Sequence, residues 1–317
     1  MTGFGKITMS WKIVNCMAFL LGILNCALVN AAQLVILFDN TLQPATSLQA
    51  VTRSQLLVRN LRMVDVKQAA FLIDTYGLDA KNEERLALYS NAGHLLVNAG
   101  HNDFLMSRKN IYRIQMNLLK ADAYLRPYLG YKKNLHLDWL NETSDMDARN
   151  KLIQFISDHE FEPAFSGILP MRAADEYINQ LYQKRKRINK PVSIEKIGKA
   201  YAKLIADDLD LYNAYASFTL GYSPVQILTL QENDVTVYSI VALVDELNKR
   251  GWQIIPSEKA FSDPVANTYA FFGFGANSYW KSVAPFLYDQ VSYPRVIGDR
   301  KVKVDQVLQQ YVPELFQ

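Results

Sequence analysis

The sequence predicts a single α/β domain built around a parallel β-sheet, and three patterns support that fold class. Residues 34–38 form an uninterrupted apolar run that ends in Asp39, Asn40 and Thr41, which is typical of a buried parallel strand with polar groups at its carboxyl end. Strand-like and helical patterns then alternate along the chain, as they do when helices connect parallel strands. Towards the C-terminus the same strand, helix, strand order returns, in residues 227–230, 237–247 and 252–255.

The first half of the domain contains six further elements with recognisable signals. Two short apolar runs, residues 69–73 and 94–97, are expected to be strands. The third of the expected helices ends at Arg126-Pro127, because a proline disfavours helical geometry in the residue before it. Apolar residues at helical spacing predict the helices over residues 54–62, 82–89, 110–125 and 145–156.

A long helix is expected after Ser193, a residue type that favours the N-cap position. The basic run at residues 184–190 is interpreted as the solvated end of the preceding helix rather than as a binding patch. The long helix faces the core, because its apolar residues fall on one side, at positions 194, 197, 201, 204 and 205.

The N-terminus has the pattern of a cleavable signal peptide. Lys6 and Lys12 precede an apolar stretch at residues 14–29, which is short for a membrane span, and small residues follow it. We therefore expect a signal peptide at residues 1–32, a mature domain at residues 33–317 and a secreted or periplasmic protein; retention of the leader as an anchor is the alternative. Both cysteines lie inside the leader, so the mature chain is expected to have no disulfide.

The composition argues against several classes of partner. Half of the 317 residues are hydrophobic and 21% are charged, which is ordinary for a soluble globular protein. The net charge of +3 falls to +1 when Lys6 and Lys12 leave with the leader (3 − 2), so nothing favours nucleic acid as a partner. No membrane span is expected after cleavage.

Four segments together resemble the motifs of the polysaccharide deacetylase family, also called the NodB-homology or carbohydrate esterase family 4 fold. They are residues 37–41 (Leu-Phe-Asp-Asn-Thr), 93–99 (Gly-His-Leu-Leu-Val-Asn-Ala), 125–128 (Leu-Arg-Pro-Tyr) and 227–234 (Ile-Leu-Thr-Leu-Gln-Glu-Asn-Asp). The resemblance implies a distorted (β/α) barrel, here with a helical insertion at about residues 170–222.

The resemblance also implies a divalent metal held by one carboxylate and two imidazoles, an aspartate base and a histidine acid. Carried over, Asp39 is the base, Arg126 is its electrostatic partner and Gln231 stands where the acid belongs. The metal positions are degenerate, with Asn40, Ala99 and Asp103. Alanine has no ligating atom and glutamine has no proton to give near neutral pH, so no cofactor is expected. The alternative is zinc or another divalent cation in a rebuilt site that recruits His101.

Three residues are predicted to contact substrate: Tyr128, His136 and Trp139, since aromatic rings stack on sugars. The sequence thus predicts an exported deacetylase-like protein with a degenerate metal site that binds a polysaccharide, an oligosaccharide or a protein partner. An active hydrolase that removes N- or O-acetyl groups is the alternative. A purely structural domain with a filled cleft is a third hypothesis.

Overall fold

The structure is a computed structural model that describes residues 31–39, 41–102, 110–136, 146–164, 172–261 and 300–316. The expected leader therefore lies almost wholly outside the described residues, as do Asn40, Asp103 and Trp139. Within the described ranges, no helix combines the length and the apolar character that crossing a membrane requires.

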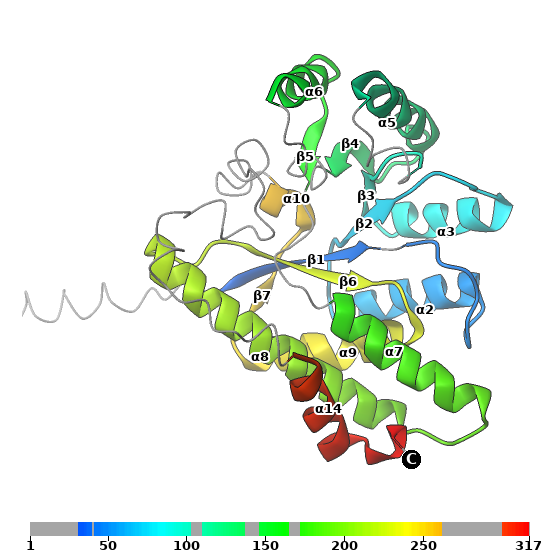
Figure 1. Ribbon diagram of the computed structural model, residues 1–317, viewed down its shortest axis with the longest axis vertical. Helices are drawn as coiled ribbons and strands as arrows, with labels where there is room; N and C mark the ends of the chain where they lie inside the picture. The colour runs from blue at the N-terminus through cyan, green and yellow to red at the C-terminus, as the bar shows by residue number, and fades with distance from the viewer. Residues whose placement is uncertain are drawn as a thin grey trace, which may run out of the picture. The chain divides into compact units, whose positions relative to one another are not determined.

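Seven strands form one sheet in which every pairing is parallel (Figure 1). Six of them lie in the order β5-β4-β3-β2-β1-β6, and β7 pairs with β1. The sequence patterns predicted five of the seven, and the two that were missed, β4 and β5, are largely polar or very short. The strands are β1 (Gln33–Asp39), β2 (Ala70–Ile73), β3 (Leu95–Asn98), β4 (Tyr131–His136), β5 (Glu162–Ala164), β6 (Gln226–Gln231) and β7 (Gln253–Ile254).

Strand β1 pairs with three other strands of the sheet, β2, β6 and β7. Residues 34–38 are completely buried, and β6 pairs in register along the strand, from Leu34 opposite Gln226 to Asp39 opposite Gln231. Because β6 occupies one edge of β1 along its length, β2 and β7 both pair with the opposite edge of β1. Strand β2 pairs near the carboxyl end of β1 and β7 pairs near its amino end.

Helices follow the strands around the outer side of the curled sheet (Figure 1), so the predicted α/β fold of the distorted-barrel type is confirmed as a half-barrel with flanking helices. Polar N-caps explain several starts: the side chains of Asp79, Asn110, Ser193 and Asn233 each accept a hydrogen bond from the backbone three residues on. The helices are α2 (Ala50–Met63), α3 (Ala80–Asn91), α5 (Ile111–Leu125), α6 (Met146–Asp158), α7 (Arg172–Arg187), α8 (Ile194–Leu220), α9 (Asp234–Lys249), α10 (Ser257–Phe261), α14 (Arg300–Tyr311) and the short 3-10 helix η3 (Pro313–Leu315).

The range expected to form a helical insertion contains α7 and α8. Ser193 caps α8 as predicted, and Ile197, Tyr201 and Ile205 are buried against the core. The basic run at residues 184–190 ends α7, where cations suit the helix dipole. Its side chains are exposed except for Arg185, which is 6% exposed.

Candidate functional site

The residues that follow parallel strands meet at one edge of a sheet, and in α/β folds that carboxyl edge is where ligands bind. Asp39 ends β1 and Gln231 ends β6, and the two residues lie opposite each other in the pairing. The structure therefore brings together two of the three predicted catalytic residues. Asp39 is half-buried, whereas Gln231 is 6% exposed.

Gln231 lacks the chemistry of a general acid. Its neutral amide has no titratable proton, and its Nε2 is buried without a hydrogen-bond partner among the described residues. An unpaired buried donor costs about 1–3 kcal/mol, so this position is not optimised for stability.

Next to Gln231 lies a buried charge cluster made of Arg53, Arg85, Glu232 and Asp234. Arg85 Nη2 donates to Glu232 Oε1 at 2.6 Å, and Arg53 Nε lies 3.5 Å from the same oxygen. Arg53 Nη1 is 3.6 Å from Asp234 Oδ1. All four side chains are at most 1% exposed, and their two positive and two negative charges cancel.

The charge cluster also holds the loop that follows β1. Glu232 Oε2 accepts from the backbone N–H of Leu42 at 3.1 Å, and Asp234 accepts from the Thr46 hydroxyl at 2.7 Å. Arg53 Nη2 donates to the carbonyl of Gln43 at 2.6 Å. The carboxylates of this cluster are thus committed to internal partners. These carboxylates carry no local signal in the sequence, because their partners lie far away along the chain.

A third buried carboxylate, Asp175 of α7, lies next to the end of β6. It accepts from the Gln231 backbone N–H at 2.8 Å, Asn233 Nδ2 at 2.7 Å and the Thr236 hydroxyl at 2.9 Å. Burial raises the pKa of Asp175 to about 6, and these hydrogen bonds oppose the increase. Asp175 joins α7 to the turn between β6 and α9.

The structure describes an ion pair of Arg126, the expected electrostatic partner of Asp39, with Asp122. Arg126 caps the end of α5, just before β4. Its guanidinium donates to Asp122 Oδ2, at 2.9 and 2.5 Å, one helical turn back. Tyr128 lies in the same turn and is half-buried.

The described part of the metal motif does not fit a divalent cation. Ala99 packs against the core and its backbone N–H donates to the Ile73 carbonyl at 3.0 Å, but its methyl group offers no ligand atom. Over the ranges described here, no three His, Cys, Asp or Glu side chains converge on a common point.

His101, the predicted substitute ligand, belongs to an aromatic cluster with Tyr76 and Tyr124. Its ring stacks on Tyr124 at 5.7 Å between ring centroids, with 5° between the planes, and Tyr76 approaches edge-on at 5.9 Å. His101 Nδ1 shares a hydrogen bond with the Thr75 hydroxyl at 2.9 Å. Burial and the nearby Lys120 lower the pKa of His101. Tyr76 and Tyr124 are 68% and 46% exposed, so the cluster offers aromatic faces to solvent.

His136 ends β4 and is half-buried. Asp39, Tyr76, His101 and His136 therefore follow β1, β2, β3 and β4 in turn, and we call them the edge row. At the usual strand spacing the row extends on the order of 15 Å. The row brings three site residues predicted from the sequence to one edge and adds Tyr76, for which the sequence carried no signal beyond its position after a strand.

His94 lies at the other end of β3 and is 3% exposed. The backbone N–H of Ala69 donates to its Nδ1 at 3.2 Å, so the neutral ring carries its proton on Nε2. Burial, aided by the charge of Arg62, lowers the pKa of His94 to about 4.

We expect the His94 imidazole to stay neutral down to about pH 5, because burial penalises its charged form. A proton NMR titration of the Hε1 resonance should show a midpoint near pH 4, well below the ordinary value of about 6.5 for a histidine. A His94 midpoint above pH 6 would contradict the buried environment described here.

No protein-family model and no curated protein matches the sequence. Solved structures are similar to it at low identity. A CE4 family pseudoenzyme from Bacillus anthracis has a TM-score of 0.47 and 10% identity, over 74% of this chain and 66% of that one. A family 4 acetyl xylan esterase from Clostridium thermocellum, in complex with a cobalt ion, has a TM-score of 0.44 and 14% identity, over 73% and 90% of the two chains.

The peptidoglycan deacetylase PdaC from Bacillus subtilis has a TM-score of 0.44 and 12% identity, over 73% of this chain and 90% of its own. The chain spans about two thirds of the length of the pseudoenzyme. In fold, this chain is similar to proteins of carbohydrate esterase family 4, deacetylases and a pseudoenzyme among them, which is the family whose motifs its sequence resembles.

Proposed function

We propose that this chain is an exported deacetylase-like protein that binds a glycan along the edge row without removing its acetyl groups. The observation that carries the proposal is the set of groups at the carboxyl edge. Where the family pattern has a metal and an acid, this edge has the Ala99 methyl group, the Gln231 amide and a charge cluster whose charges cancel. Export rests on the predicted leader.

Loss of hydrolysis follows from the groups available at the edge. Asp39 retains a carboxylate that would act as a base, but Gln231 beside it has no proton for a leaving amine. The neighbouring carboxylate of Glu232 is held by Arg53 and Arg85. Without a metal, no described group polarises an acetyl carbonyl.

Binding of a glycan is supported by the exposed aromatic cluster. Sugar rings present apolar faces and hydroxyl groups together, and they stack on aromatic side chains that have polar neighbours. Tyr76 and Tyr124 supply exposed rings, and His101 and Thr75 lie between them. His136 and Asp39 extend the same edge with further hydrogen-bonding groups.

The Tyr124→Ala variant should bind an oligosaccharide about tenfold more weakly than the wild type, because one stacking face is lost. Calorimetric titration with N-acetylchitotetraose and with acetylated xylotetraose measures the change. Tyr112→Ala is the matched control, since Tyr112 is also on α5, is 68% exposed and lies outside the cluster.

Acetate release from the same oligosaccharides, in the presence of added Zn²⁺ or Co²⁺, tests the catalytic half of the proposal. We expect none above the uncatalysed rate. Release that is lost in Asp39→Asn would instead establish the alternative, an active hydrolase that uses the retained base. Equal binding by the wild type and Tyr124→Ala would remove the aromatic cluster from the glycan site.

A further inference from the structure

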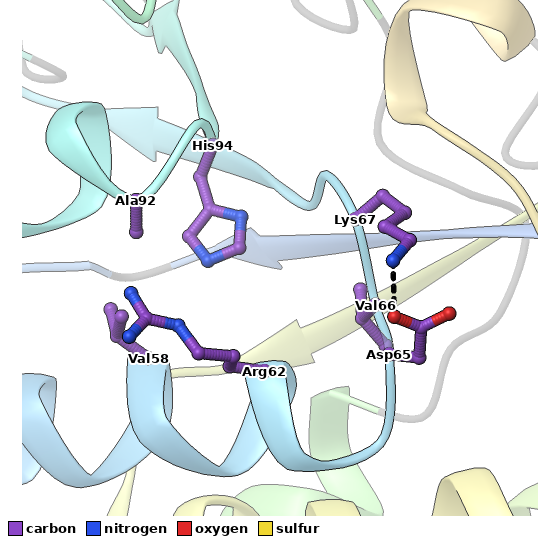
Figure 2. A pocket seen from close by; sticks show the side chains of 7 residues that line it. All are labelled: Val58, Arg62, Asp65, Val66, Lys67, Ala92 and His94. Atoms are coloured by element: carbon purple, nitrogen blue, oxygen red, sulfur yellow. Dashed lines mark hydrogen bonds and ion pairs between the residues drawn. The ribbon is translucent and has the colours of Figure 1, made fainter.

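A separate pocket opens at the amino edge of the sheet, away from the edge row. It lies between the end of α2, the start of β2 and the turn before β3 (Figure 2). It encloses about 170 Å³ of space. A water molecule takes up about 30 Å³ in the liquid, so the pocket has room for roughly five or six non-hydrogen atoms.

His94 forms one wall of this pocket and has an unused donor there. Its Nδ1 is occupied by the Ala69 N–H, so its proton is on Nε2. Figure 2 shows the ring directed towards the Arg62 side chain. No described residue accepts a hydrogen bond from Nε2, although the side chain is 3% exposed. This N–H is therefore available to a ligand in the pocket.

Arg62 faces His94 across the pocket and also lacks a partner. Asp65, the one acidic residue of the lining, is hydrogen-bonded to Lys67. Across the described part of the chain, no carboxylate pairs with Arg62. The charge of Arg62 reaches His94, since it contributes to the lowered pKa of that ring. Two sets of N–H donors thus face one space whose single acidic side chain, Asp65, is hydrogen-bonded to Lys67.

We propose that this pocket binds a small monocarboxylate with a short apolar chain, between acetate and butyrate in size. One carboxylate oxygen accepts from His94 Nε2, and the guanidinium of Arg62 binds the carboxylate as a planar fork, a geometry that arginine favours. The hydrocarbon chain lies against Val58, Val66 and Ala92, which make up the apolar part of the lining.

The charge of the lining favours a monoanion over phosphate. Arg62 and Lys67 contribute two positive charges and Asp65 contributes one negative charge, which leaves one positive charge for the ligand to neutralise. The carboxyl-terminal ends of α2 and α3 also reach the pocket. Their dipoles oppose any anion, and they oppose a dianion more strongly than a monoanion.

An NMR titration of the purified protein at constant ionic strength tests the proposal, with sodium acetate and sodium butyrate as probes and sodium chloride as the reference. The His94 Hε1 resonance should shift saturably with both carboxylates. Arg62→Gln should weaken binding about tenfold. The matched control is Arg59→Gln, because Arg59 is an exposed arginine of α2 outside the pocket, and it should bind like the wild type.

Absence of a saturable shift, or equal affinity in Arg62→Gln and the wild type, would overturn the proposal. Tighter binding of inorganic phosphate than of butyrate, with the same dependence on Arg62, would overturn the carboxylate class. Arg62 is exposed and unpaired, so its substitution should leave the fold intact. The glycan titrations report on the opposite edge, and failure of one proposal is therefore distinguishable from failure of the other.

Discussion

Replacement of Glu232 with glutamine should lower the free energy of unfolding by about 3–5 kcal/mol, the usual cost of leaving a buried ion without its partner. Glutamine keeps the shape of the side chain but leaves Arg85 buried without a counter-charge and Arg53 with only Asp234, at 3.6 Å. The loop after β1 also loses the carboxylate oxygen that accepts from Leu42.

Urea denaturation followed by circular dichroism measures this change. Glu160→Gln is the matched control, since it removes the exposed pair of Glu160 with Lys133 and should cost less than about 1 kcal/mol. Joint replacement of Arg85 and Glu232 by methionine should destabilise less than the sum of the two single replacements. If Glu232→Gln lowered the free energy of unfolding by less than about 1 kcal/mol, water would have to solvate the charge cluster, contrary to the burial described here.

Replacement of Asp175 with asparagine should change how stability depends on pH. The pKa of Asp175 rises from the usual 3.8 to about 6 in the folded protein, so the folded state holds this proton more tightly than the unfolded state does. Ionisation of Asp175 therefore removes stability from the wild type as the pH rises from about 4 to about 6, and the full loss, on the order of 3 kcal/mol, is present at pH 7.

Asparagine does not titrate. Its amide nitrogen is a donor, and it would face N–H and O–H groups that donate hydrogen bonds to the Asp175 carboxylate. At pH 4 we expect Asp175→Asn to be less stable than the wild type by about 1–3 kcal/mol, because at least one buried donor loses its acceptor. The difference between the two proteins should vanish or reverse by pH 7, because ionisation of Asp175 costs the wild type about 3 kcal/mol by then. Denaturation curves at pH 4, 5, 6 and 7 test this, and a constant or growing difference would contradict the buried carboxylate.

Much of the sheet was predictable because β1 and β6 are buried on both faces. Such strands show as continuous apolar runs, and those at residues 34–38 and 227–230 became β1 and β6. Strand β4 escaped prediction because Lys132 and Lys133 interrupt its pattern, and β5 has only three residues.

The candidate site was less predictable, for two physical reasons. A short motif such as Arg126-Pro127 does not reveal which end of a strand it will meet, and here it precedes β4 rather than following it. The partners of Glu232 are remote in sequence: Arg85 is 147 residues away and Arg53 is 179 residues away. Local patterns carry no information about charges that meet only after folding.

The position of β1 has a consequence for synthesis of the chain. In the sheet, Leu34 of β1 pairs with Gln226 and with Ile254. These residues are synthesised 192 residues (226 − 34) and 220 residues (254 − 34) after Leu34. At about 5–20 residues per second, a ribosome needs roughly 10–40 s to deliver the partner strand β6. During that interval one whole edge of an apolar strand is unpaired, the kind of surface that attracts other chains and chaperones. The first strand of this domain thus depends for its protection on segments that are made much later.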